Sequence, residues 1–356
     1  MGKSAINKSL MMMYVIGHFA VDFSCAFLLF RMIYSSDQWY LCLILYNFCA
    51  FAMQMPLGIL ADQWNRNGVC AALGCAMVVL SYGFAFVFMR SDFRVFTPEI
   101  LIVITAGIGN ALFHIGGGID VLNAGKEKAK LLGVFVAPGA LGIYLGTLCG
   151  KQDQIAGVVV AIILSIIAIL ILWRCFKSKK SFRSDNVPIS FKGIQSLGLL
   201  LALFCLILVV CLRSYTGMSA NFPWKGQGEW GIALVCGVVL GKVCGGFLAD
   251  WLGIMTTSIL SLGLSAIFYL LSGYPLFGTI AVFLFNMTMP ITLWGVVQIL
   301  KGAKGFAFGL LTFALYIGFL PVYMEWNMIG ITGLVLAITS LCSMLLLIIG
   351  LRKVVG

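Results

Sequence analysis

Charged residues are scarce in this sequence: Asp, Glu, Lys and Arg together make up only 10% of its 356 residues. Soluble domains carry roughly 25%, and 62% of the present residues are hydrophobic. Water therefore cannot be the solvent for most of the surface, and the chain has no room for a water-soluble domain. Its long apolar runs approach the roughly 20 residues that a helix needs to span the hydrocarbon core of a bilayer.

Histidine is rarer still, with two residues in the whole chain, which excludes a His-rich metal site. The twelve cysteines are scattered singly without a Cys-x-x-Cys pair, and we interpret them as small buried apolar residues. The glycine run Gly116-Gly117-Gly118 lacks the Lys-Ser/Thr of a nucleotide-binding loop. Nothing else in the sequence resembles a nucleophile motif or a metal-ligand cluster. We therefore expect no cofactor, no bound metal and no enzymatic activity.

Acidic residues are also few, and 12 of them against 23 basic residues leave a net charge of +11. A strongly basic chain can bind nucleic acid, but here the basic residues follow a membrane topology. With the N-terminus in the cytoplasm, 16 of the 23 fall in cytoplasmic segments, which is the positive-inside pattern. The sequence thus predicts a protein of a prokaryotic inner (plasma) membrane, with both termini cytoplasmic and no nucleic-acid partner.

Apolar runs bounded by charges or by Gly/Pro clusters predict twelve transmembrane helices. Helices are required because backbone groups in lipid must be hydrogen-bonded within their own segment. The fold class that we expect is an all-α polytopic membrane protein with two pseudo-symmetric six-helix bundles. The predicted spans cover approximately residues 10–33, 39–61, 69–89, 97–118, 131–150, 155–173, 194–217, 229–250, 254–272, 276–298, 304–323 and 328–350.

The longest predicted cytoplasmic loop divides the chain near its middle. It covers residues 174–192 and separates an N-terminal bundle over 1–173 from a C-terminal bundle over 193–356. Because the loop is basic, we expect it to contact anionic lipid headgroups. The residues that would do so are Lys177, Lys179, Lys180 and Arg183.

A repeated signature closes the second and eighth spans: Gly58-Ile-Leu-Ala-Asp62 and Gly246-Phe-Leu-Ala-Asp250, which lie 188 residues apart. Such a repeat is expected if one membrane bundle has been duplicated in parallel, with a substrate path between the halves. Glycine permits close approach of helices, and an acidic side chain can cap the start of a neighbouring helix. We therefore predict a conformational latch that consists of Gly58, Asp62, Arg66, Gly246 and Asp250.

These residues resemble the signature of the major facilitator superfamily, whose loop between spans two and three carries Gly-x-x-x-Asp-Arg-x-Gly-Arg-Arg. Gly58, Asp62 and Arg66 match that signature, whereas Gln63 and Asn65 stand where the family has Arg and Gly. The resemblance implies a transporter in which spans one, four, seven and ten line a central cavity.

Three short stretches are similar to the fosmidomycin-resistance branch of that superfamily: Gly17-His18-Phe-Ala-Val-Asp22, Gly107-Ile-Gly109-Asn110-Ala-Leu-Phe113-His114 and Leu212-Arg213-Ser214-Tyr215. The branch continues its Phe-His pair with Pro-Glu-Gly, and this chain has Ile115-Gly116-Gly117 instead. The acid of the branch is therefore absent here. The resemblance implies export of a small compound in exchange for protons.

Ionisable side chains within the predicted spans are costly in lipid and are functional candidates by default. His18 and Asp22 are four residues apart and share one face of the first span, where a histidine can exchange protons near neutral pH. We predict Asp22 as the proton carrier and His18 as its modulator. The predicted substrate-binding residues come from spans four, seven and ten: Asn110, His114, Arg213, Tyr215, Asn286, Trp294 and Gln298.

Structural roles compete with these interpretations. His18 and Asp22 are also consistent with a hydrogen-bonded pair that joins helices, and His114 with a helix cap. Arg213 could snorkel to the outer interface, and the sequence leaves open whether Lys242 faces the cavity or snorkels. In span five, Pro138 and the Gly142-x-x-x-Gly146 motif are similar to an element of exporters, but helix packing alone also explains them.

The function that we predict is secondary active transport of a small amphiphilic or anionic organic compound, coupled to protons and working by alternating access. Efflux by antiport is favoured through the resemblance. Uptake by proton symport, uniport of a small metabolite and a non-transporting membrane sensor remain alternatives. The expected partners are the substrate, protons and membrane lipids.

Overall fold

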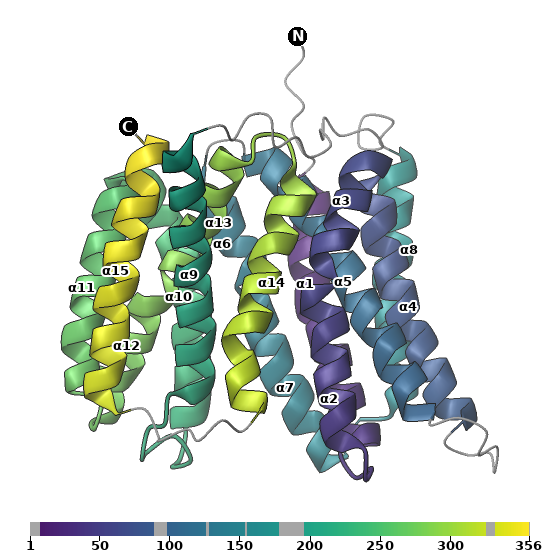
Figure 1. Ribbon diagram of the computed structural model, residues 1–356. Coiled ribbons are helices and arrows are strands. Elements are labelled where there is room, and N and C mark those ends of the chain that lie inside the picture. Colours follow the sequence, from purple (N-terminus) through teal and green to yellow (C-terminus); the bar gives the residue numbers. More distant parts are fainter. Residues whose placement is uncertain are drawn as a thin grey trace.

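The computed structural model describes residues 8–88, 98–125, 128–153, 155–177, 196–324 and 332–355, and this part of the chain is helical with no β-strand (Figure 1). Within it, eleven helical segments are long and apolar enough to cross a membrane. Ile254–Leu270 is a shorter apolar helix and provides the twelfth span. The predicted all-α membrane fold is thus confirmed.

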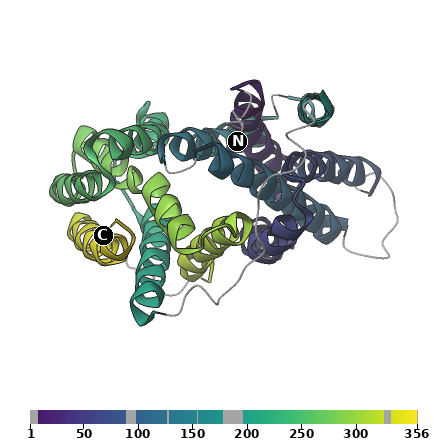
Figure 2. The same ribbon diagram turned by 90° about the horizontal axis from the view of Figure 1, so that it is seen from above.

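The first six spans form one group of helices and the last six form another, side by side (Figures 1 and 2). The start of α1 and the end of α15 lie at the same end of the bundle, which is called the termini side below. The first group contains α1 (Lys8–Leu28) with the π-helical η1 (Leu29–Ile33), α2 (Trp39–Asn47), the π-helical η2 (Phe48–Ala52), α3 (Gln54–Trp64), α4 (Asn67–Phe88), α5 (Pro98–Gly125), α6 (Lys130–Val136), α7 (Pro138–Gln152) and α8 (Gly157–Lys177). The second contains α9 (Leu197–Ser219), α10 (Trp230–Leu252), α11 (Ile254–Leu270), α12 (Pro275–Asn286), α13 (Thr288–Ile299), α14 (Lys304–Tyr323) and α15 (Gly333–Val355).

Two helix boundaries differ from the predicted ones in ways that matter. Helix α5 continues to Gly125, past the predicted end at 118, so Asn110 and His114 lie near the middle of their span. Helix α8 continues to Lys177, so the first residues of the predicted linker 174–192 are helical. The rest of that linker, with Lys179, Lys180 and Arg183, lies outside the described residues.

The surface of the bundle is apolar, as a protein embedded in lipid requires. On α8, Ile162, Ile166 and Ile169 are each at least half exposed. An exposed apolar face of this size would be unfavourable in water. All twelve cysteines are free, and most are buried among apolar residues.

Glycines of α7 allow it to pack directly on the backbone of α1. A Cβ atom at Gly142 would lie 2.5 Å from the carbonyl oxygen of Phe19, and one at Gly146 would overlap the carbonyl of Phe23. Such close approach is possible only for residues without side chains. The glycine pattern of span five is therefore explained by helix packing, without any need for an exporter signature.

A residue with positive φ forms the turn that follows each copy of the repeated signature. Asn65 has φ 54° and ends α3, with its N–H donating to the Ala61 carbonyl at 2.9 Å. Asparagine is one of the few residues other than glycine that adopt this conformation readily. Asn65 can therefore stand where the superfamily signature has glycine. Gly253, with φ 92°, occupies the corresponding turn after α10.

Candidate functional site

Three ionisable side chains from α1 and α5 meet in the interior of the first group. Within α1, His18 Nε2 lies 3.3 Å from Asp22 Oδ2. His114 of α5 approaches both residues: its Nε2 lies 2.9 Å from His18 Nε2 and 3.6 Å from Asp22 Oδ1. All three residues are buried, with at most 8% of their surface exposed. His18, Asp22 and His114 are called the trio below.

Asn110, one helical turn before His114, contacts two members of the trio and fixes the position of one ring hydrogen. Its Nδ2 donates to Asp22 Oδ1 at 2.9 Å, and its backbone carbonyl lies 2.8 Å from His114 Nδ1. Because a carbonyl only accepts, His114 Nδ1 must carry a hydrogen. A neutral His114 therefore accepts at Nε2, and the hydrogen between the two rings belongs to His18. The trio thus holds an exchangeable proton next to a carboxylate.

The other nitrogen of His18 agrees with this assignment. His18 Nδ1 is buried and has no hydrogen-bond partner among the described residues. A lone pair without a donor is more readily accommodated than a buried N–H without an acceptor. The neutral His18 ring with its hydrogen on Nε2 leaves a lone pair at Nδ1, as the surroundings require.

The break between α6 and α7 forms one wall of the trio. A Cβ atom at Gly139 would overlap both Asp22 Oδ2 and His18 Nε2. The Phe135 ring lies edge-on to His18, with 4.8 Å between ring centroids. Pro138 interrupts the helix here, so an apolar ring and a bare backbone line the trio on this side.

Lys242 of α10 extends from the second group toward the trio. Only 9% of its surface is exposed, and its Nζ donates to the Val136 carbonyl of α6 at 3.2 Å. Its charge acts on all three residues of the trio. The question left open by the sequence is thereby answered: Lys242 faces the protein interior.

The trio also has a spacing that could hold a metal ion, because its three ligand atoms lie within 4.8 Å of one another. The nearby charge of Lys242 opposes a divalent cation more strongly than it opposes a proton, since Coulomb repulsion scales with charge and is weakly screened inside a protein. Protons are therefore the cations that this arrangement accommodates more readily.

Arg213 of α9 is buried as well, with 8% exposed. It does not reach solvent at the outer interface; its Nη1 donates to the hydroxyl of Thr292 in α13 at 3.2 Å. Spans seven and ten are thus joined by a cationic group whose partner is neutral.

The other predicted substrate contacts are less closely tied to the trio. The Asn286 amide donates to the Val282 carbonyl of its own helix at 2.9 Å. Tyr215, Trp294 and Gln298 are half-buried on α9 and α13. Their roles as substrate contacts stay predictions.

The acids of the repeated signature connect the two groups at the termini side. Asp62 accepts from the backbone N–H groups of Gly305 and Phe306 at 2.9 and 3.0 Å, which caps the start of α14. Asp250 accepts from Ala129 and Lys130 at 2.8 and 3.3 Å, at the start of α6. Asp62, at the end of span two, thus caps span eleven, and Asp250, at the end of span eight, caps span five. In both cases the capped helix belongs to the other group.

The glycines of the signature bring the same helices together. A Cβ at Gly58 would overlap the backbone of Gly305, and one at Gly246 would lie 2.8 Å from the Ala129 carbonyl. Arg66, the remaining predicted latch residue, is exposed and makes no ion pair within the described part of the chain. Of the predicted latch residues, the two acids and the two glycines therefore make the contacts between the groups.

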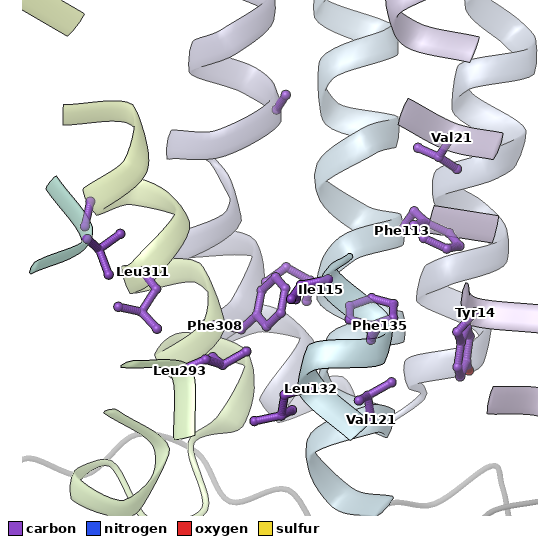
Figure 3. Packing of buried hydrophobic residues seen from close by; sticks show 14 of the residues in the cluster. Tyr14, Val21, Phe113, Ile115, Val121, Leu132, Phe135, Leu293, Phe308 and Leu311 are labelled. Atoms are coloured by element: carbon purple, nitrogen blue, oxygen red, sulfur yellow. The ribbon is translucent and has the colours of Figure 1, made fainter. Parts of the chain in front are cut away.

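Phe135, which contacts His18, belongs to a cluster of buried apolar side chains (Figure 3). Phe308 of α14 packs on Phe135 of α6 with 6.3 Å between ring centroids. Ile115, Leu132 and Leu293 lie around this pair. Together with the two capping acids, this cluster joins the two groups of helices on the termini side.

One buried acid, Asp120, was missed in the sequence. Asp120 accepts from the Tyr14 hydroxyl at 2.6 Å and from the Asn67 amide at 2.8 Å. This network joins α1, α4 and α5 near the termini side. The predicted end of span four at residue 118 placed Asp120 in a loop, although its position only two residues beyond that end, directly after Ile119, was a usable signal.

Comparison with known proteins yields similarity in structure only: no family model matches the sequence, and no curated protein matches it. The crystal structure of the E. coli fucose:proton symporter FucP aligns with a TM-score of 0.68 at 14% identity, over 97% of this chain and 98% of that one. A FucP structure in the outward conformation, described as a major facilitator superfamily transporter, aligns with a TM-score of 0.62 at 14% identity, over 96% and 99%.

A bacterial homologue of the iron transporter ferroportin, in an outward-facing state, aligns with a TM-score of 0.66 at 13% identity, over 97% of this chain and 98% of that one. At these identities the likeness concerns the fold, and it covers nearly the whole of each chain. No similarity specific to the fosmidomycin-resistance branch is among these findings.

Proposed function

We propose that this chain, which has the fold of major facilitator superfamily transporters, is a proton-coupled secondary transporter of a small organic compound. The trio carries the proposal. Two histidines and a carboxylate are buried together in hydrogen-bonding contact, at mid-span in a membrane protein. Such groups are costly in lipid, and they typically mark proton or substrate paths. The fold is compatible with proton coupling, since one protein that shares it is named as a proton symporter.

The cycle that we propose alternates access to the trio from the two sides of the membrane. The contacts of Asp62 and Asp250 and the Phe135–Phe308 pair join the two groups on the termini side, and they support a state that is closed there. Release of both acids would let the groups rock apart there and close on the opposite side. From the distribution of basic residues, we assign the termini side to the cytoplasm of a prokaryotic inner membrane.

The substrate that we propose is small and amphiphilic or anionic, with Arg213 as its anchor. Two directions of coupling remain. Resemblance in sequence favours efflux in exchange for protons, whereas the position of Lys242 beside the trio favours movement of substrate and proton together. Uniport or a sensor role would require that substrate binding leave the protonation of the trio unchanged.

The test is a measurement of proton exchange by purified protein in weakly buffered detergent, with a pH-sensitive dye. Small carboxylates, phosphate esters and amphiphilic amines are added in turn, and binding is measured in parallel by calorimetry. We expect binding to be accompanied by proton uptake or release in the wild type and in the matched surface variant Asp37→Asn, but not in Asp22→Asn. Binding without any proton exchange in the wild type would contradict proton coupling and indicate a uniporter.

A further inference from the structure

Two buried cations of the second group, Arg213 and Lys242, form no salt bridge with an acidic side chain among the described residues. Each is at most 9% exposed, and their hydrogen-bond partners are a hydroxyl of Thr292 and the carbonyl of Val136. Buried charges are normally paired with an opposite charge. We infer that Arg213 and Lys242 together bind the anionic group of the substrate, and that this anion and a proton on the trio move in the same direction.

The hydrogen bonding of Arg213 suits it to bind an anion. The Thr292 hydroxyl accepts from Arg213 and itself donates to the carbonyls of Thr288 and Met289. The hydrogen-bond partner of Arg213 is therefore a neutral group. The hydrogen bond to Thr292 uses only Nη1 of the guanidinium, and no acidic side chain forms a salt bridge with Arg213 within the described segments. A guanidinium with free N–H groups is suited to bind a carboxylate or phosphate through two parallel hydrogen bonds.

Lys242 lies where it can share such an anion with Arg213. Its charge acts on Arg213, which repels it, and on Asp22, which attracts it. An anion between the two cations would relieve their repulsion. Because Lys242 also bonds to the Val136 carbonyl of α6, the anion would be held where the two groups of helices meet.

The sign of the coupling follows from Lys242. In the absence of an anion, its positive charge opposes the arrival of a proton on the trio. A bound anion offsets that charge, so the trio accepts a proton more readily. By reciprocity, a proton on the trio must increase the affinity for the anion. An anion and a proton that each increase the affinity for the other are carried together, which is cotransport. Exchange would require that the anion and the proton compete for binding.

The remaining titratable groups near the trio do not alter this sign. Cys25 of α1 and Tyr46 of α2 interact electrostatically with Asp22, and both are uncharged near neutral pH at ordinary pKa values. Other side chains against the trio, those of Asn110, Phe113 and Phe135, do not titrate. Lys242 is thus the charged residue that connects the anion site to the trio. The inference rests on the proposed function, and it selects symport from the two directions left open there.

The experiment uses the full-length protein in detergent and three probes: acetate, benzoate and inorganic phosphate. Binding is measured by calorimetry at pH 6, 7 and 8, and proton exchange by the dye. We expect proton uptake when an anion binds, and an affinity that rises by up to about tenfold per pH unit as the pH falls, for one linked proton. Carboxylates that bind while phosphate does not would identify the anionic group as a carboxylate, and the reverse result as a phosphate.

Variants separate the two cations from general effects of charge. Lys242→Gln should bind the anion more weakly and lose the linked proton uptake, whereas Lys242→Arg should retain both. Arg213→Gln should lose most of the anion affinity, and the exposed control Lys225→Gln should behave as wild type. Each variant is compared as a monodisperse sample, so that misfolding is recognised, and Lys242→Arg shows that position 242 tolerates change.

Several results would overturn the inference while leaving proton coupling intact. Proton release on anion binding would reverse the sign of the linkage, and unchanged proton uptake in Lys242→Gln would remove its cause. Proton release on addition of Zn²⁺, with no response to any of the anions, would make the cargo a metal cation. If anions bind with no proton exchange in the wild type, the proposed function fails as well, and Asp22→Asn then binds anions as the wild type does.

Discussion

Removal of the Asp62 carboxylate should open the termini side of the protein. In Asp62→Ala, the N–H groups of Gly305 and Phe306 lose a buried acceptor that is 1% exposed. Loss of a helix cap costs about 0.5–2 kcal/mol, and loss of a negative charge at a helix start costs about 0.3–1 kcal/mol more. Because these groups are solvated when the halves separate, about 1–3 kcal/mol of preference for the closed state is lost. That corresponds to a change of about 5–150-fold in the ratio of open to closed protein.

The same reasoning gives a smaller effect for Asp250→Ala. Asp250 is exposed, and one of its two hydrogen bonds is longer, at 3.3 Å to the Lys130 N–H. Water competes for an exposed carboxylate, so its contribution should be below about 1 kcal/mol. The ratio of open to closed protein should therefore change less than in Asp62→Ala.

Double electron–electron resonance measures both effects. Spin labels are attached at Gln63→Cys and Lys301→Cys, two exposed positions on opposite sides of the contact between α3 and α14. The exposed native cysteines Cys236 and Cys342 are first replaced by serine. We expect Asp62→Ala to add a population with a longer distance between the labels, and the exposed-acid control Asp37→Ala to leave the distribution unchanged. A folded Asp62→Ala protein with the distribution of the control would refute the latch.

Three further predictions concern the packing around the trio and the termini side. Gly139→Ala should abolish proton-coupled transport in proteoliposomes, because its Cβ would overlap Asp22 and His18. Transport should be unaffected in Gly217→Ala, where a Cβ meets nothing within 4 Å. An active Gly139→Ala protein would contradict the described geometry. Tyr14→Phe should lower the thermal unfolding midpoint in detergent, because Asp120 loses a buried donor that is worth about 1–3 kcal/mol; an unchanged midpoint would show that water replaces the hydroxyl. Phe308→Ala should let a water-soluble thiol reagent added on the termini side react with the cysteine of Phe135→Cys. Equal labelling of Phe135→Cys with and without Phe308→Ala would show that the Phe308 ring does not seal the path.

The sequence predicted the spans well because each is a long apolar run with a clear boundary. Its main error in length was at α5, where polar residues with internal partners continue the helix after residue 118. Asp120 forms hydrogen bonds to Tyr14 and Asn67, which are 106 and 53 residues distant in sequence, so neither partner could be inferred from local pattern. From the sequence alone, a buried acid with hydrogen-bond partners cannot be distinguished from an acid in an exposed loop.

The trio shows what helical spacing can and cannot provide. Spacing placed His18 with Asp22, and Asn110 with His114, on shared helix faces. It could not show that the two faces meet, nor that His114 Nε2 lies 2.9 Å from His18 Nε2. Lys242 was undecided for the same reason, since a lysine in mid-span snorkels or turns inward according to its tertiary neighbours. The substrate roles of Tyr215, Asn286, Trp294 and Gln298 stay predictions.

The two capping acids have a consequence for the origin of the fold. The acid that ends the second span of either half caps the fifth span of the other half, so the contact is reciprocal. A reciprocal contact is the isologous interface of a twofold-symmetric dimer. An unfused six-helix unit with this acid and this helix start already carries both sides of the closure, and two copies of it could close on each other without a linker. Fusion into one chain then frees each copy to diverge, which lets histidines and an aspartate accumulate in one half and unpaired cations in the other.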